Sequence, residues 1–160
     1  MAGGLTNSPS GIQTIDALLG NFRWSSLNLT YNFPTSVAYY DQATYFTAGN
    51  GGLGVTPSFD FSTFGALTPS LGVAIDHVIA TQFMAVAPLN YTKTAASDPN
   101  ADSSFGMANV FNDPDLGTIR GGVGYGPGIV DRGGDAWFNI TLPRFNDVHM
   151  GNHAYYNVLH

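Results

Sequence analysis

The chain has 160 residues, of which 44% are hydrophobic, so it is long enough and apolar enough to form a domain with its own core. Its net charge is −6 with only five Lys and Arg residues, which excludes the basic surface that nucleic-acid binding requires. It contains no Cys, which excludes disulfides and thiolate metal sites and leaves His, Asp and Glu as metal ligands.

Charged residues make up only 10% of the chain, against about a quarter in an average protein. Such a polar but uncharged surface favours an extracytoplasmic location, either secreted or periplasmic. No window approaches the roughly 20 apolar residues that a membrane span needs, so no transmembrane segment is expected. We expect residues 1–160 to form a single domain or subdomain, with a flexible N-terminus over residues 1–10.

The first elements are a short helix and a strand. Residues 12–19 carry Ile and Leu at helical spacing, which predicts an N-terminal helix. Residues 27–33 alternate apolar and polar side chains until Pro34 ends the run, which predicts a half-buried strand.

A longer helix follows the pair Thr68-Pro69, which is typical of an N-cap and first turn. Apolar residues then recur at helical spacing until Pro88, in the order Leu71, Ile75, Val78, Ile79, Phe83 and Val86. The sequence therefore predicts one long amphipathic helix.

The last third contains further strands and a final helix. Residues 104–111 and 136–142 are predicted strands, and the glycine-rich residues 122–128 form a loop or a strand edge between them. Gly151 and Asn152 then indicate a helix start, with Asn152 as cap and Ala154, Tyr155 and Val158 facing the core. The pattern therefore predicts an α+β chain with several strands, one long helix and a C-terminal helix.

Two well-separated stretches carry a more specific signal. The first contains GIQTIDALL (residues 11–19), Trp24, LTYNFP (residues 29–34) and Tyr39-Tyr40, and the second contains GGDAWFN (residues 133–139) followed by GNHAYYNVLH (residues 151–160). In this order they resemble the start of the catalytic domain of the serralysin family of secreted zinc metallopeptidases, which belong to the metzincins. In that family the second stretch continues into H-E-x-x-H-x-x-G-x-x-H.

The resemblance implies a fold, a cofactor and site residues. The fold would be the N-terminal subdomain of a metzincin, a twisted mixed sheet that the active-site helix closes. His160 would be the first zinc ligand of the complete enzyme. Ala136, Trp137 and Phe138 would lie near the cleft edge that pairs with extended peptide substrate by strand addition.

Residues 1–160 depart from the family pattern in the catalytic machinery. No Glu follows His160, and the second and third His ligands are absent, so the general base is missing and no catalytic residue is assigned. A single imidazole does not hold zinc, because zinc sites need three or four ligands. We therefore expect the N-terminal portion of a zinc metalloendopeptidase that, as these 160 residues alone, binds no cofactor and hydrolyses no peptide.

Two alternatives remain open at this stage. The chain could be a catalytically dead, peptidase-like structural or binding subunit of a larger extracytoplasmic or membrane-associated assembly, with a protein partner covering its C-terminal face. Separately, His149, His153 and His160 have the spacing of a three-histidine site on one helix. Because the helix should begin at Gly151-Asn152, His149 is expected in the preceding loop, which favours surface or capping roles.

Overall fold

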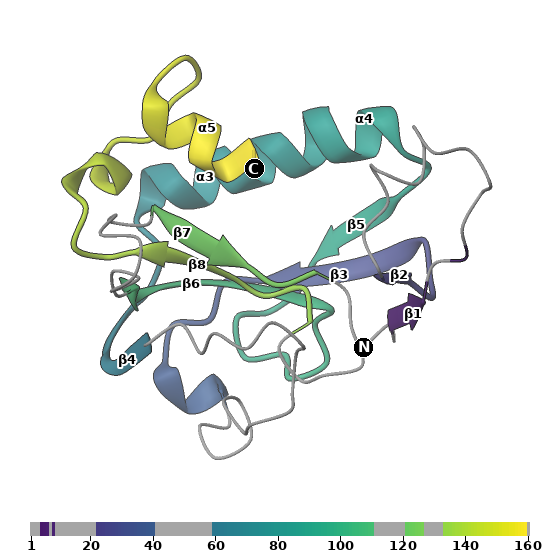
Figure 1. Cartoon of the computed structure of the whole chain (residues 1–160), viewed down its shortest axis with the longest axis horizontal. Coiled ribbons are helices and arrows are strands. Elements are labelled where there is room, and N and C mark those ends of the chain that lie inside the picture. The colour runs from purple at the N-terminus through teal and green to yellow at the C-terminus, as the bar shows by residue number, and fades with distance from the viewer. Residues whose placement is uncertain are drawn as a thin grey trace.

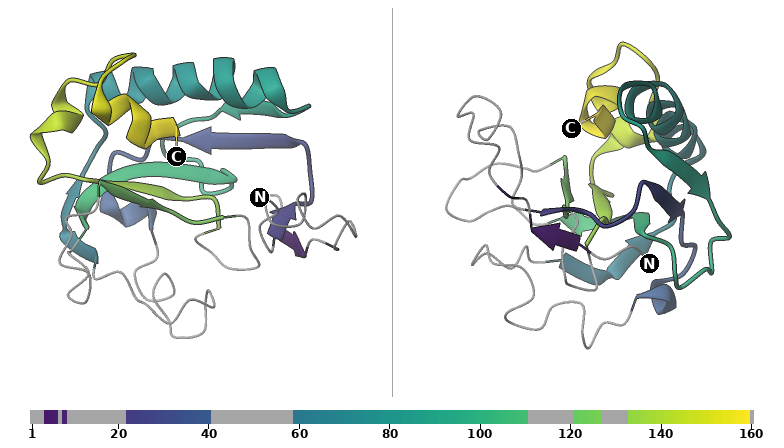
Figure 2. Two further views of the ribbon diagram at one scale, coloured as in Figure 1. Left: turned by 45° about the horizontal axis from the view of Figure 1, so that its top comes forward. Right: turned by 90° about the vertical axis from the view of Figure 1, so that its right-hand side faces the viewer.

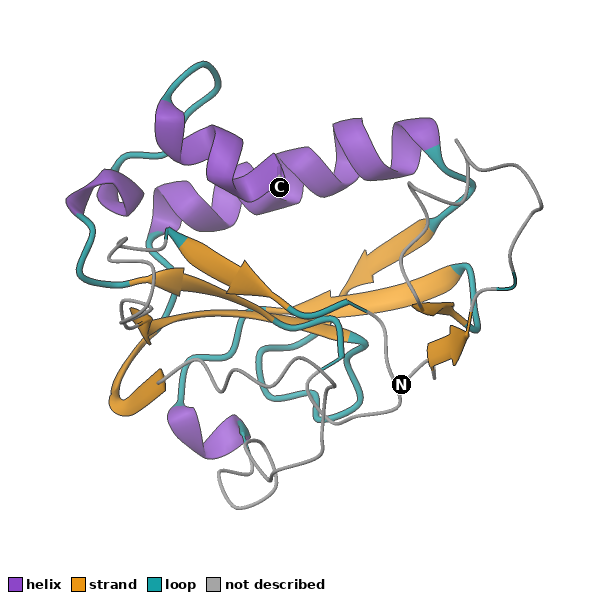
Figure 3. Ribbon diagram, viewed as in Figure 1, coloured by secondary structure: helices purple, strands orange, loops and turns teal. Residues whose placement is uncertain are grey.

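The computed structural model describes residues 4–6, 8, 22–40, 59–110, 121–126 and 133–159. The fold is α+β: a mixed, mostly parallel six-stranded sheet carries a long helix and a C-terminal helix on the same face (Figure 1). The views in Figure 2 agree on this placement. In Figure 3 the short 3-10 helix η1 lies on the other side of the sheet.

The strands are β1 (Gly4–Thr6), β2 (Phe22–Trp24), β3 (Asn28–Asn32), β4 (Phe59–Gly65), β5 (Asn90–Lys93), β6 (Ser103–Val110), β7 (Gly122–Gly124) and β8 (Ala136–Asn139). The helical elements are η1 (Val37–Tyr39), α3 (Pro69–Val78), the π-helical turn η2 (Ile79–Phe83), α4 (Met84–Val86), η3 (Pro143–Asn146) and α5 (His153–Leu159).

The sheet is built around three parallel pairings. Its strand order is β5-β3-β6-β8-β7, and β4 additionally pairs with β6. The pairs β3/β5, β3/β6 and β6/β8 are parallel, whereas β4/β6 and β7/β8 are antiparallel. Strand β3 pairs with the start of β6 at Ser103, and β4 pairs with its end at Val110.

Strand β3 confirms the strand predicted over residues 27–33, but it is buried on both faces rather than one. Leu29 and Tyr31 are buried beside polar Asn32, which is fully buried. The amide Nδ2 of Asn32 donates to the carbonyl oxygen of Asp98 at 3.0 Å. Strand β3 lies inside the sheet, and the loop after β5 covers its second face. Asn32 points to this face and is buried there, where its side chain forms a hydrogen bond with the loop.

The long helix begins as predicted. The Thr68 side chain accepts a hydrogen bond from the backbone N–H of Leu71 at 3.3 Å, and Pro69 occupies the first turn. The buried stripe ends at Ile79, where the π turn begins, and residues 80–85 are exposed. A π turn takes the following residues out of the 3.6-residue register, which explains why Phe83 is 38% exposed although its spacing placed it on the buried face.

Strand β8 is shorter than the predicted strand over residues 136–142. The Asn139 side chain accepts hydrogen bonds from the backbone N–H and the hydroxyl of Thr141, at 3.0 and 2.8 Å. This turn ends the strand, because the side chain competes with the sheet for the backbone. The other strand predictions hold: residues 104–111 correspond to β6, and β7 lies within the glycine-rich segment.

Two predictions concerned the N-terminal part of the chain: a flexible segment over residues 1–10 and a helix over residues 12–19. Three of the residues expected to be flexible, Gly4–Thr6, form β1, whose backbone pairs antiparallel with β2. The helix predicted over residues 12–19 lies outside the described residues. Within the described part of the chain, no helix is both long enough and apolar enough to cross a membrane.

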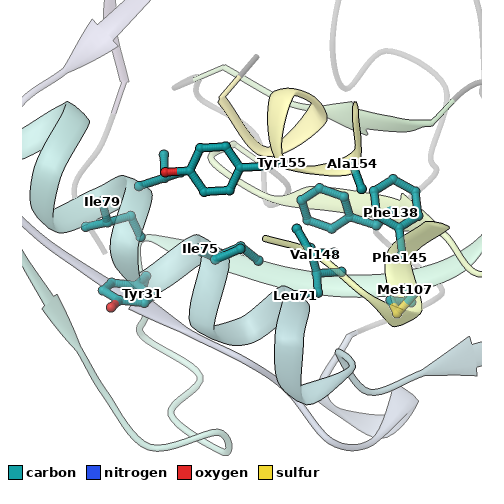
Figure 4. Close-up of a cluster of buried hydrophobic side chains, with 12 residues drawn as sticks. Tyr31, Leu71, Ile75, Ile79, Met107, Phe138, Phe145, Val148, Ala154 and Tyr155 are labelled. Atoms are coloured by element: carbon teal, nitrogen blue, oxygen red, sulfur yellow. The ribbon is translucent and has the colours of Figure 1, made fainter. Parts of the chain in front are cut away.

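The main core lies between the helices and the sheet (Figure 4). It contains Tyr31, Leu71, Ala74, Ile75, Val78, Ile79, Met107, Phe138, Phe145, Val148, Ala154 and Tyr155. A smaller cluster of Tyr40, Ala108 and Trp137 packs separately. Adjacent residues of a strand point to opposite faces, so Phe138 joins the main core while Trp137 joins the second cluster.

Candidate functional site

Helix α5, which leads to His160, has a well-formed start. Gly151 has a φ of 91°, and the Asn152 side-chain oxygen accepts a hydrogen bond from the backbone N–H of Tyr155 at 2.9 Å. The Asn152 Nδ2 group donates to the carbonyl oxygen of Asp147 at 2.7 Å. The predicted Asn152 cap is therefore confirmed, and it ties the helix start to the preceding loop.

The same helix is held against α3 by packing and one hydrogen bond. Ala154 and Tyr155 are buried, and Val158 packs against the main core, as predicted. The Tyr155 hydroxyl lies 2.8 Å from the Nδ1 atom of His77 on α3. Figure 4 shows Tyr155 and Ala154 pointing from α5 into the core. These contacts fix the position of α5 up to Leu159.

The histidines do not form a metal site within the described residues. His160, the expected first zinc ligand, directly follows α5 and lies outside those residues. His149 precedes the helix, with its Nδ1 atom 3.1 Å from the Asn152 amide, and the Nδ1 atom of His153 lies 3.3 Å from the Asn157 amide. No group of three potential ligands converges in the described part of the chain. These residues alone therefore do not fit a zinc ion.

The expected substrate-pairing residues lie one strand inside the sheet edge. Ala136, Trp137 and Phe138 pair with β6 on one side and with β7 on the other. The side chains of Trp137 and Phe138 are only 1% and 6% exposed. Both backbone edges of β8 are thus occupied, and its residues cannot themselves pair with an added strand. Strand addition at this end of the sheet would have to use β7 instead.

Strand β7 has one unpaired backbone edge within the described residues. Gly121 accepts a hydrogen bond from Asn139, and Tyr125 donates one to Asp135, both at 2.8 Å. In an antiparallel pair, residues that bond to the partner strand alternate with residues whose N–H and C=O groups point outward. Because Gly121 and Tyr125 bond to the β8 side, the N–H and C=O groups of Gly122 and Gly124 point away from β8. These two glycines form an edge that another extended chain can approach closely.

The two glycines of this edge differ in their surroundings. A Cβ atom on Gly122 would lie 2.5 Å from the carbonyl oxygen of Trp137, so glycine is required there. A Cβ atom on Gly124 would have no atom within 4 Å. The start of the strand lies next to α5, because a Cβ atom on Gly121 would lie 2.5 Å from Oδ1 of Asn157. We call the surface of Gly121, Gly122, Gly124 and Asn157 the β7–α5 site.

Buried carboxylates on other strands have a structural role. Asp102 accepts hydrogen bonds from the backbone N–H and hydroxyl of Thr30, at 2.8 and 2.9 Å. Asp135 accepts one from the backbone N–H of Ser104 at 2.9 Å. Each carboxylate precedes one strand and bonds the backbone of a neighbouring strand. These bonds stabilise the strand starts.

The sequence predicted a loop or a strand edge over residues 122–128 but did not single it out for binding, because glycine has no side chain and so leaves no apolar and polar alternation. The signal that could have indicated such a role is a Gly-x-Gly stretch that precedes, along the chain, a strand with strong alternation. Comparisons with models of known protein families and with curated proteins found no match for this chain.

Proposed function

We propose that these residues form the N-terminal part of the catalytic domain of a serralysin-like, secreted zinc metalloendopeptidase. In this proposal, the sheet positions an extended peptide, and helix α5 leads to His160, the first zinc ligand of the complete enzyme. The α+β fold, with a long helix and a C-terminal helix on one face of a mixed sheet, is consistent with the metzincin subdomain that the sequence resemblance implies.

The observation that supports the proposal most is that a capped helix lies next to a strand edge that is unpaired within the described residues. Helix α5 is held in place, up to Leu159, by the Asn152 cap and by Tyr155. The start of β7 lies against Asn157 of that helix. A peptide bound along β7 would therefore pass close to the end of α5, where a peptidase needs its reacting groups.

The proposal assigns binding and positioning to these residues and leaves the chemistry to groups outside them. The described residues do not fit zinc by themselves, and residues 1–160 contain no H-E-x-x-H sequence. A polypeptide of only these residues should therefore bind extended peptides at β7 and should not cleave them.

The alternative, a peptidase-like subunit without activity, rests on exposed apolar side chains near α5. Met150 and Tyr156 are 68% and 52% exposed. In an assembly, such residues would lie under a partner chain. Single exposed apolar residues are also common on monomeric proteins, so this observation carries less weight than the capped helix and the strand edge.

The test measures peptide cleavage by the protein isolated from its source, with Gly124→Pro and Gly124→Ala as a matched pair. Proline removes the outward N–H of residue 124 and adds a ring at the edge, but it breaks no bond to β8. We expect Gly124→Pro to raise KM by about fivefold or more, as loss of one backbone hydrogen bond implies, and Gly124→Ala to keep KM.

Cleavage that a zinc chelator abolishes and that Gly124→Pro weakens would support the proposal. The absence of cleavage by the source protein would contradict it and would favour the inactive subunit. Equal KM values for the two variants would contradict the assignment of β7 as the peptide-binding edge.

A further inference from the structure

Arg144 is a half-buried cation for which the described part of the chain provides no hydrogen-bond or ion-pair partner. It lies in η3, directly after the turn that ends β8. Its Nε atom is buried and makes no hydrogen bond within the described part of the chain. The ring of Phe145 lies beside it, with its centre 5.7 Å from the guanidinium carbon.

This arrangement differs from that of the two other cationic residues that the structure describes. Lys93 forms an ion pair with Asp76 at 2.8 Å, and Arg23 is exposed to solvent. Arg144 has neither an ion pair in the described residues nor full exposure. A guanidinium group carries five N–H donors, and leaving a buried donor unsatisfied is unfavourable. A half-buried arginine of this kind is well suited to an external anion.

The guanidinium group lies at the start of the free strand edge. A Cβ atom on Gly121 would lie 3.6 Å from the Nη2 atom of Arg144 and 2.5 Å from Oδ1 of Asn157. Both side chains therefore reach the same point, one residue before β7 begins. No carboxylate of the described residues pairs with Arg144 there, so this end of the β7–α5 site has a positive charge available to a ligand.

We infer that Arg144 recognises a carboxylate of the extended peptide that pairs with β7, so that the site selects acidic peptides. The inference rests on the proposed function for the use of β7 as a peptide-binding edge. The carboxylate can come from an Asp or Glu side chain or from the C-terminus of the peptide.

The geometry of strand pairing supports this inference. A chain added to β7 would lie about 4.8 Å from it, and opposed Cβ atoms would be about 5 Å apart. The Nη2 atom of Arg144 lies closer than this to the Cβ position of Gly121. An acidic side chain opposite Gly121 can therefore reach the guanidinium group. Arginine binds carboxylates through two parallel N–H donors, so the interaction between the charges is also directional.

Arg23 offers a matched control, because it is an exposed arginine on a different, two-stranded sheet. Replacing either arginine by glutamine changes the net charge of the chain equally. A difference between Arg144→Gln and Arg23→Gln would therefore reflect the place of the cation rather than the total charge.

The experiment measures binding of short labelled peptides to the 160-residue chain by fluorescence anisotropy. The probes are a capped, extended peptide with one central Glu, the same peptide with Gln, and the Gln peptide with a free C-terminal carboxylate. We expect the Glu peptide to bind about tenfold more tightly than the capped Gln peptide, as a charge-assisted hydrogen bond implies. Tight binding of the third peptide instead would identify the C-terminus as the source of the carboxylate.

Arg144→Gln should remove the preference for the carboxylate, Arg144→Lys should keep part of it, and Arg23→Gln should leave it unchanged. The preference in the unmodified chain should also fall as salt concentration rises, which tests the inference even if a variant fails to fold. Equal binding of all three peptides would overturn the inference while leaving β7 as a binding edge. Absence of binding by every peptide would overturn both.

Discussion

Replacing Asn152 by Ala tests whether the cap holds the helix that leads to His160. Helix α5 spans only His153–Leu159, and a helix this short is not stable without tertiary contacts and caps. The substitution removes the hydrogen bond that Oδ1 accepts from the N–H of Tyr155, at 2.9 Å, and the one that Nδ2 donates to the carbonyl oxygen of Asp147, at 2.7 Å.

The expected loss follows from these two bonds. Removal of an N-cap costs about 1 kcal/mol, and a further hydrogen bond costs about the same when it is buried. Because Asn152 is partly exposed, we expect a total of about 1 to 2 kcal/mol in the free energy of unfolding, which corresponds to about 5- to 30-fold in the equilibrium constant.

Two measurements check this value. Urea denaturation gives the change in the free energy of unfolding, and hydrogen exchange followed by mass spectrometry gives the protection of the α5 amides. The control Asn152→Asp keeps a side-chain acceptor and places a negative charge at the helix N-terminus, so it should retain most of the stability. If Asn152→Ala changes neither the stability nor the exchange of α5, the cap does not hold this helix and the reasoning is refuted.

Three further predictions concern packing and ionisation. Gly122→Ala should lower the melting temperature because its Cβ atom would lie 2.5 Å from a carbonyl oxygen of β8, whereas Gly124→Ala should leave it unchanged; thermal unfolding of the two variants checks this. Tyr155→Phe removes the hydroxyl that lies 2.8 Å from Nδ1 of His77 and should cost about 1 kcal/mol in urea denaturation, and no change would show that packing alone holds α5. Burial raises the pKa of Tyr91 to about 12, although the hydrogen bond with Ser103 opposes this shift. The folded state then keeps a proton that the unfolded state loses near pH 10, so the stability contributed by Tyr91 is present below pH 10 and is lost between about pH 10 and 12. Urea denaturation across this range should show a smaller decline for Tyr91→Phe than for the unmodified chain, and equal declines would contradict the assignment.

Local signals in the sequence predicted the elements that side chains define. The long helix could be predicted because Thr68 caps it and apolar residues recur at helical spacing up to Ile79. Strands β6 and β8 could be predicted because their sequences contain apolar residues interspersed with polar ones. The Asn152 cap could be predicted because Asn after Gly is a typical helix start.

The arrangement of the sheet could not be read from such signals. The order β5-β3-β6-β8-β7 depends on hydrogen bonds between strands far apart in the sequence, and no residue pattern in β8 shows that both of its edges are occupied. For this reason Ala136, Trp137 and Phe138 were expected near the pairing edge, whereas β8 lies between β6 and β7 in the sheet. Arg144 was not singled out, because the missing partner of its Nε atom among the described residues is a property of its surroundings in the fold.

The most direct test of the proposed function is the intact mass and zinc content of the protein isolated from its source. The proposal predicts a chain heavier than 16.9 kDa that carries zinc in a one-to-one ratio and loses it when His160 is replaced by Ala. A chain of 16.9 kDa without zinc would contradict the peptidase proposal and would favour an inactive subunit that binds peptides or a partner protein.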